Sequence, residues 1–359
     1  MERSRVIYFS LLILACVALA AFNMSVPANA QNGISVAAPT PTPSPTPKPI
    51  KEEEGVIRVD TELVNINVRV VDRNTRPVGG LKKSDFTVLE DGVPQEIEFF
   101  SQSELPTNYS LVVDNSGSLR RQIEKVIDAG KILVNSNRPQ DEAMIIRFVS
   151  SDKISVEQDF TNKKEYLIDA LDNFHIEGGQ TAIRDAVYLA AEKIGAHEKS
   201  NRAEDRLRRA MILVTDGEDR ASFYTESQLY QMLRESDVQI YVIGFIQDLD
   251  KESGLIRKSD QSRAKDFLEK LASETGGKAY FPTGLEQLSG IAKEIATDMR
   301  AQYSIGYLPT NLKEDGTFRE IKVNISDGAG QQKRIALTKA GRMAGAVPDP
   351  SKPGAKPKQ

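Results

Sequence analysis

The sequence is organised around one stretch, which reads Leu111-Val112-Val113-Asp114-Asn115-Ser116-Gly117-Ser118. An apolar run ends at Asp114, and two hydroxyl residues, Ser116 and Ser118, follow at alternate positions. A buried strand that ends in this pattern places three small oxygen ligands beyond its last residue. Hard divalent cations such as Mg²⁺ prefer oxygen donors of this kind, without sulfur or imidazole. The alternative is an ordinary turn after a strand, because Asn, Ser and Gly are also turn residues.

The composition excludes several classes of protein. The 359 residues are enough for about two domains. With a net charge of -4, the chain has no basic footprint for nucleic acid. The single cysteine, Cys16, lies in an N-terminal apolar run, so the rest of the chain can form neither a disulfide nor a cysteine-based zinc site. The two histidines, His175 and His197, are too few for a His-rich metal centre.

The N-terminus has the pattern of an export signal. Two arginines precede the almost wholly apolar run 6–22, and Ala28-Asn29-Ala30 forms a cleavage site. We therefore expect a signal peptide at residues 1–30 and a secreted, periplasmic or cell-surface protein. The alternative is an uncleaved membrane anchor, because the apolar run has about the length needed to span a bilayer.

Residues 31–55 are predicted to form a Pro-rich linker. In the tract 39–49, proline alternates with Thr, Ser or Lys. Such a tract cannot build a core and favours the polyproline II conformation. We expect a stiff spacer between the N-terminus and the folded part of the chain.

Two flanking segments show the period-two pattern of β-strands. In the first, Val64, Ile66, Val68 and Val70 alternate with polar residues, and further strands are expected at 86–89 and 96–100. In the second, strands are expected within 303–307, 318–325 and 335–337. We predict one small, sandwich-like all-β domain made from 56–103 and 301–340, followed by a disordered tail at 341–359. The alternative is two separate β-caps.

Between these flanks, strand and helix patterns alternate along the chain. The run Ala210-Met211-Ile212-Leu213-Val214 is continuously apolar, which is typical of a parallel strand buried on both faces. Alternation of strands and helices predicts an α/β fold with a doubly wound, mostly parallel, Rossmann-like sheet. We place this domain at residues 104–300, inserted in the β-domain.

Three chain segments bring oxygen ligands to one edge of the predicted sheet, because ligands bind beyond the carboxyl ends of parallel strands. One segment follows the central strand, one is the loop that begins Glu177-Gly178-Gly179, and one follows the apolar strand 210–214. The predicted metal ligands are Asp114, Ser116, Ser118, Thr181 and Asp216. Since Mg²⁺ needs six oxygens, water or an outside carboxylate must complete the shell.

These motifs resemble the metal-ion-dependent adhesion site (MIDAS) of von Willebrand factor type A (VWA) domains. The resemblance covers roughly residues 108–300, and the motifs are Asp114-x-Ser116-x-Ser118, Gly178-Gly179-x-Thr181 and Thr215-Asp216-Gly217. The flanks contain Leu81-x-x-x-Asp85-Phe86, Glu90-Asp91-Gly92-x-Pro94-Gln95 and Tyr303-x-Ile305-Gly306-Tyr307. With these motifs they resemble the exported bacterial "VWFA-related domain" type first noted in Acidobacteria. The resemblance implies direct binding of Mg²⁺ (or Mn²⁺) by the three hydroxyls, with the two carboxylates acting partly through water. It also implies that an acidic side chain of a partner protein supplies the last ligand.

The expected function is divalent-metal-dependent protein binding or adhesion by an exported protein that is not an enzyme. One alternative is an envelope scaffold with a structural or degenerate metal site, and a less favoured one is a metal-dependent hydrolase. A serine hydrolase would need a Gly-x-Ser-x-Gly elbow, which the sequence lacks. Outside the motifs, we expect Glu218 and Asp219 to form an exposed acidic loop. We expect the arginines of 202–209 to be solvated.

Overall fold

The computed structural model describes residues 63–102, 105–200, 207–247, 260–328 and 332–345. The predicted signal peptide and the Pro-rich linker lie outside the described residues, as do residues 346–359 of the predicted tail. Among the described helices, none combines the length and the apolar character that crossing a membrane requires.

A six-stranded sheet forms the centre of the α/β part, in the order β10-β9-β8-β5-β6-β7. Neighbouring strands are parallel except for the β6–β7 pair at one edge, which is antiparallel. This confirms the predicted α/β fold with a mostly parallel sheet. The strands are β5 (Thr107–Asp114), β6 (Glu142–Phe148), β7 (Ile154–Thr161), β8 (Arg208–Thr215), β9 (Gln239–Gly244) and β10 (Ala279–Tyr280).

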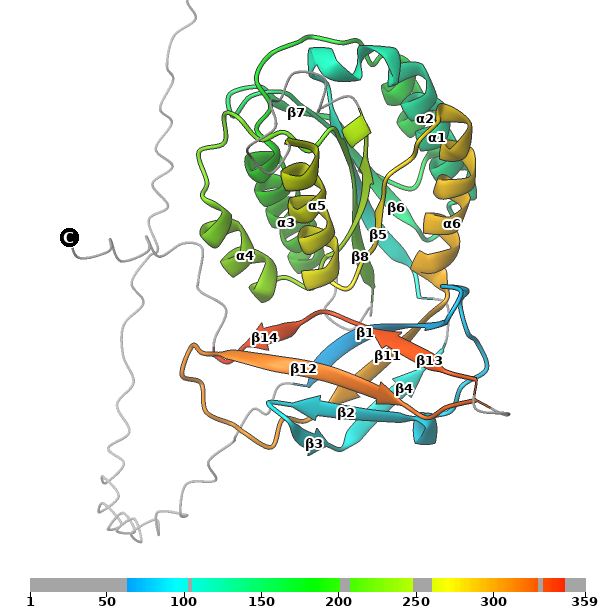
Figure 1. The fold of residues 1–359 in the computed structure, drawn as a ribbon, viewed down its shortest axis with the longest axis vertical. Helices are drawn as coiled ribbons and strands as arrows, with labels where there is room; N and C mark the ends of the chain where they lie inside the picture. The colour runs from blue at the N-terminus through cyan, green and yellow to red at the C-terminus, as the bar shows by residue number, and fades with distance from the viewer. Residues whose placement is uncertain (1–62, 103–104, 201–206, 248–259, 329–331, 346–359) are drawn as a thin grey trace, which may run out of the picture. The chain divides into compact units, whose positions relative to one another are not determined.

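Six α-helices cover the two faces of this sheet (Figure 1). One face carries α1 (Ile123–Ser136), α2 (Lys164–Asp172) and α6 (Leu288–Arg300). The other carries α3 (Ile183–Ser200), α4 (Glu226–Glu235) and α5 (Asp260–Glu274). Short 3-10 helices are η1 (Lys83–Asp85), η2 (Gly117–Arg121) and η4 (Leu285–Gln287).

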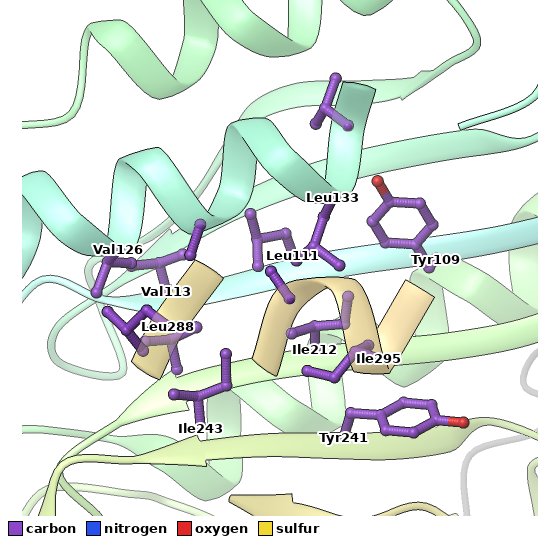
Figure 2. Close-up of a cluster of buried hydrophobic side chains, with 14 of the residues drawn as sticks. Tyr109, Leu111, Val113, Val126, Leu133, Ile212, Tyr241, Ile243, Leu288 and Ile295 are labelled. Carbon is purple, nitrogen blue, oxygen red and sulfur yellow. The ribbon is translucent and has the colours of Figure 1, made fainter. Parts of the chain in front are cut away.

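The central strand β5 is buried along its whole length, because helices pack on both faces of the sheet. Tyr109, Leu111 and Val113 point into the core beneath α1 and α6 (Figure 2). Val112 belongs to the second core cluster, on the face that α3, α4 and α5 cover. Packing on both faces fixes the strand, so the position of Asp114 at its carboxyl end is fixed as well.

Two four-stranded sheets flank the α/β part in the sequence, and each combines strands from both flanks. The first has the order β13-β1-β11-β4, and the second has the order β14-β12-β2-β3. Their inner side chains form one hydrophobic cluster. The domain boundaries at 56–103 and 301–340 remain a prediction. The strands are β1 (Val64–Asp72), β2 (Phe86–Glu90), β3 (Val93–Gln95), β4 (Ile97–Ser101), β11 (Gln302–Tyr307), β12 (Phe318–Ile325), β13 (Arg334–Leu337) and β14 (Gly341–Met343).

The structure contains two strands that the sequence did not predict. These are β3 and β14, each of three residues, which is too short for an alternating pattern to be visible. β14 lies within the stretch that was expected to be disordered, and it pairs with β12. Its Arg342 guanidinium donates to both carboxylate oxygens of the buried Glu90, at 2.9 and 3.2 Å. This ion pair accounts for an ordered strand where the hydrophobic pattern gave no signal.

Candidate metal centre

Asp114 ends β5 with a carboxylate that is wholly buried. One carboxylate oxygen accepts a hydrogen bond from the Ser116 amide at 2.9 Å. The other accepts from the Thr215 hydroxyl at 2.7 Å. Because Thr215 ends the neighbouring strand β8, the two central strands together fix the direction of this carboxylate.

The two serines of the first motif lie together beside Asp216. The Ser116 and Ser118 hydroxyl oxygens are 2.8 Å apart, within hydrogen-bond distance. Oδ1 of Asp216 accepts from the Glu218 amide at 3.0 Å, and the nearby Ser118 hydroxyl acts to lower the pKa of this carboxyl group. Ser118 is exposed, whereas Ser116 and Asp216 are buried. The first and third predicted segments therefore meet through side-chain contacts.

Thr181 is brought to the same edge by backbone hydrogen bonds. Its carbonyl accepts from the amides of Arg220 and Ala221, at 2.9 and 3.1 Å, in the loop that follows Asp216. The side chain of Thr181 is buried, and its hydroxyl has no hydrogen-bond partner in the part of the chain that the structure describes. The segments that carry the five predicted ligands are thus joined by hydrogen bonds at one edge of the sheet.

Glycines let the loop before Thr181 lie against the sheet. Gly178 and Gly179 both have positive φ, of 79° and 138°. A Cβ atom on Gly179 would lie 2.6 Å from Cγ1 of Val149, too close for any other residue without a shift. The Asn115 carbonyl accepts from the amides of Glu177 and Gly178, at 3.4 and 3.3 Å. The loop is therefore tied to the first motif on one side and to β6 on the other.

The two carboxylates lie in an environment that disfavours their charge. Burial and the charge of Asp216 raise the pKa of Asp114 to about 7, although hydrogen bonds from Ser116 and Thr215 oppose the shift. Burial also raises the pKa of Asp216, against hydrogen bonds from the Ser118 hydroxyl and the Glu218 amide. Two like charges in one buried place destabilise each other, and a cation between them would relieve that repulsion.

The donor set fits a hard divalent cation. It consists of two carboxylates and three hydroxyls, all oxygen donors, with no nitrogen or sulfur. The described residues contain no group of three or more His, Cys, Asp or Glu side chains that could hold a metal ion. The hydroxyls carry no formal charge, so the set would roughly balance the charge of one Mg²⁺ or Mn²⁺.

Sequence reasoning gave no role to two residues of this centre. Thr215 was part of a matched motif, but its hydrogen bond to Asp114 was not predicted. Asn115 occupies an unspecified position of the first motif, yet its side chain is fully buried, and neither Oδ1 nor Nδ2 has a hydrogen-bond partner among the described residues. No sequence signal identifies either role, because both depend on how neighbouring strands and loops pack.

Two expectations about charged residues were wrong. Asp219 is not part of a free acidic loop, because it accepts two hydrogen bonds from the Arg184 guanidinium, at 3.1 and 3.2 Å. Arg208 is not solvated. It is 3% exposed and donates to the carbonyls of Met299, Arg300 and Gln302, at 2.7 to 2.9 Å. Arg202 and Arg206 lie outside the described residues.

A protein-family model described as von Willebrand factor type A domain matches residues 110–294, just over half of the chain. Among curated proteins, none matches. One similar solved structure is an aerotolerance-related membrane protein from Bacteroides fragilis, with 18% identity and a TM-score of 0.41 over 54% of this chain and 98% of that chain. Another is proximal thread matrix protein 1 from the mussel byssus, solved with zinc in its MIDAS motif. It has 17% identity and a TM-score of 0.43 over 55% of this chain and 48% of that chain.

Proposed function

Because the chain belongs to the von Willebrand factor type A domain family, we propose that it is an exported protein-binding module with a metal-ion-dependent adhesion site. In this proposal Asp114, Ser116, Ser118, Thr181 and Asp216 hold one Mg²⁺ or Mn²⁺ ion. An acidic side chain of a partner protein completes the coordination. The proposal also assigns the chain to the exported bacterial VWFA-related type, which the sequence motifs of the flanks support.

The observation that carries the proposal is that three separate chain segments converge on one buried pair of carboxylates. Asp114 ends β5, Asp216 follows β8, and Thr181 stands on the loop before α3. A turn after a single strand would not need the other two segments. The hydroxyls leave a bound cation strongly electrophilic, so it would attract a further oxygen ligand.

The difference in exposure supports a ligand that arrives from outside. Among the five proposed ligands, Ser118 is exposed and the other four are at most 4% exposed. A cation in this place would therefore be reached from the Ser118 side. A site of purely structural use would gain nothing from an open coordination position, which favours partner binding over a scaffold role.

Metal titration calorimetry on the exported chain tests the site. We expect saturable binding of about one Mg²⁺ or Mn²⁺ per chain, because the set offers ligands for a single octahedral ion. Asp114→Ala and Thr181→Ala should both abolish it. Asp128→Ala and Thr297→Ala, at exposed positions of α1 and α6, are the matched controls and should bind as the wild type does. A folded wild type that binds neither ion would overturn the proposal.

Export is tested separately. Arg3, Arg5, the apolar run 6–22 and the Ala28-Asn29-Ala30 sequence support cleavage after residue 30. We expect the protein recovered outside the cytoplasm to begin at Gln31 when its N-terminus is sequenced. An intact N-terminus on a membrane-bound protein would instead identify an uncleaved anchor.

A further inference from the structure

Phe223 is the most exposed large hydrophobic side chain in the described part of the chain, at 81%. It stands on the loop between β8 and α4, seven positions after Asp216, which is one of the proposed metal ligands. A single exposed apolar residue on a surface is ordinary. Phe223 differs from such a residue because hydrogen bonds and ring stacking hold the loop that carries it.

Buried Asp185 fixes the backbone at Phe223. Its two carboxylate oxygens accept from the amides of Phe223 and Tyr224, at 2.8 and 2.9 Å. The Ser151 hydroxyl also donates to this carboxylate, and it lies 2.7 Å from the carbonyl oxygen of Ala221. The Phe223 ring is therefore presented by a loop that is tied at both neighbouring peptide groups.

Aromatic contacts fix the next side chain as well. The Tyr224 ring stacks on Tyr188 of α3, with the ring centroids 4.0 Å apart and the planes 8° from parallel. Phe223 meets Tyr224 edge to face, with centroids 5.5 Å apart. Because the supporting ring is itself packed, the ordering entropy that Phe223 would lose on contact with a partner is small.

The same loop connects Phe223 to the proposed metal site. The amides of Arg220 and Ala221 donate to the carbonyl of Thr181. Two peptide units separate Ala221 from Phe223, so their Cα atoms lie within about 8 Å of each other. An extended partner segment of three or four residues, which spans roughly 10–14 Å, could reach from the metal to this ring.

The segment that follows Ser118 carries two cationic side chains, Arg120 and Arg121. Arg121 lies three residues after Ser118 in the 3-10 helix η2, and residues spaced by three eclipse one another in such a helix. Arg121 therefore lies on the Ser118 side of η2. Arg120 and Arg121 are exposed, and neither forms an ion pair with any residue that the structure describes, whereas Arg184 and Arg220 each pair with a neighbouring acid.

We propose that the partner binds this site through an acidic segment whose apolar side chain packs on Phe223. One carboxylate of the segment reaches the metal, and further carboxylates face Arg120 and Arg121. The inference rests on the proposed function. A membrane surface is a poorer occupant, because a single exposed phenylalanine buries too little apolar area to hold a protein on a bilayer.

Peptide selection tests the proposal. Random displayed peptides of about 12 residues, which extend to roughly 40 Å, are captured on the wild-type chain in Mg²⁺ and eluted with chelator. We expect the eluted peptides to share Asp or Glu with an apolar residue within four positions, and an excess of acidic residues. The most enriched peptide is then synthesised, and its affinity is measured in Mg²⁺.

Variants separate the two contacts. Phe223→Ser should weaken binding of that peptide by about tenfold or more, as expected for a central aromatic anchor. Arg121→Ala should weaken it about threefold and reduce its salt dependence, because an exposed charge pair is screened by salt. Phe223→Tyr and Val93→Ser should leave the affinity unchanged, since Val93 is an exposed apolar residue on β3. All variants should bind Mg²⁺ as the wild type does.

Several outcomes would overturn the inference. If Mg²⁺ binds and the peptide binds Phe223→Ser as tightly as the wild type, the inference is wrong and the proposed function stands. Selection that yields no chelator-eluted peptide despite Mg²⁺ binding overturns it too. Binding to vesicles of phosphatidylethanolamine and phosphatidylglycerol, or self-association, that is lost in Phe223→Ser would assign the ring to a membrane or to a second copy. Absence of Mg²⁺ binding would instead remove the proposed function.

Discussion

Thr215 shows how much of the candidate centre depends on a residue outside the proposed ligand set. Its hydroxyl donates to Asp114 at 2.7 Å and accepts from the Gly217 amide at 3.2 Å. Neither Thr215 nor Asp114 is exposed at all. One hydroxyl thus orients the first carboxylate and begins the loop that carries Asp216.

Thr215→Val removes this hydroxyl and keeps the shape of the side chain. We expect the free energy of unfolding to fall by about 1–3 kcal/mol, because a buried carboxylate oxygen and a buried amide both lose their partner. Mg²⁺ affinity should fall as well. Urea denaturation and calorimetry measure both quantities. Thr297→Val, at an exposed position of α6, is the control and should change stability by no more than about 0.5 kcal/mol. If Thr215→Val changes neither the free energy of unfolding nor the Mg²⁺ affinity, the role of the Thr215 hydroxyl in orienting Asp114 is contradicted.

Single residues also show where prediction from sequence ends. The five proposed ligands could be chosen because each belongs to a short motif at the end of a predicted strand or at the start of a predicted helix. Arg208 could not be interpreted in this way, because its three carbonyl partners lie 91 to 94 residues further along the chain. Local sequence around an arginine does not reveal whether distant carbonyls will surround it.

Among the elements, the loop before α3 has a strict steric requirement. Gly179 has a φ of 138° and faces Val149 with no room for a Cβ atom. The sequence allowed a sharp bend to be predicted here, because two consecutive glycines precede Gln180 and Thr181. It did not identify Val149 as the neighbour, since that contact depends on the packing of the loop against the end of β6.

Gly179→Ala should therefore damage the site through the backbone. We expect a loss of more than about 1 kcal/mol in unfolding free energy, from the clash and the unfavourable φ together. Mg²⁺ binding should weaken, because Thr181 is two residues away. Gly290→Ala is the matched control, in an exposed part of α6 where a Cβ meets nothing within 4 Å. It should stabilise the protein by about 0.5–1 kcal/mol. Urea unfolding compares the two, and equal effects would refute the steric argument.

On the scale of the whole molecule, an ion pair joins α6 to the strand β1. Arg69 of β1 and Asp298 of α6 are 4% and 3% exposed, and the Arg69 guanidinium donates to the Asp298 carboxylate. Burial raises the pKa of Asp298 even though the charge of Arg69 opposes the shift. The pair is well formed, and its formation requires both charges to leave water.

Removal of one member of this ion pair should therefore lower the free energy of unfolding more than removal of both members. We expect Asp298→Ala to lower the unfolding free energy by about 3–5 kcal/mol, because it leaves Arg69 buried and unneutralised. The double variant Arg69→Met, Asp298→Leu should lose much less. A double-mutant cycle from urea denaturation gives the coupling between the two residues. A double variant as unstable as Asp298→Ala would contradict the expectation.

The sequence predicted the succession of strands and helices along the chain better than their partners. Period-two alternation identified β1, a continuous apolar run identified β8, and the alternation of element types was sufficient for the class of the central sheet. It could not indicate that β1 lies between β13 and β11, or that β4 pairs with β11. Antiparallel pairing of distant strands has no local signature, so the arrangement of the two flanking sheets required the structure.

Because β1 pairs with β11, the sheet that contains β1 cannot form until β11 has been synthesised. Arg69 of β1 and Asp298, which immediately precedes this pairing, are 229 residues apart. At about 5–20 residues per second, the ribosome needs roughly 10–50 s to supply the missing partner. Until then β1 is an apolar strand with open edges, the kind of segment that aggregates or binds chaperones. We therefore expect a chain truncated before β11 to be prone to aggregation, because β1 then lacks its partner strands.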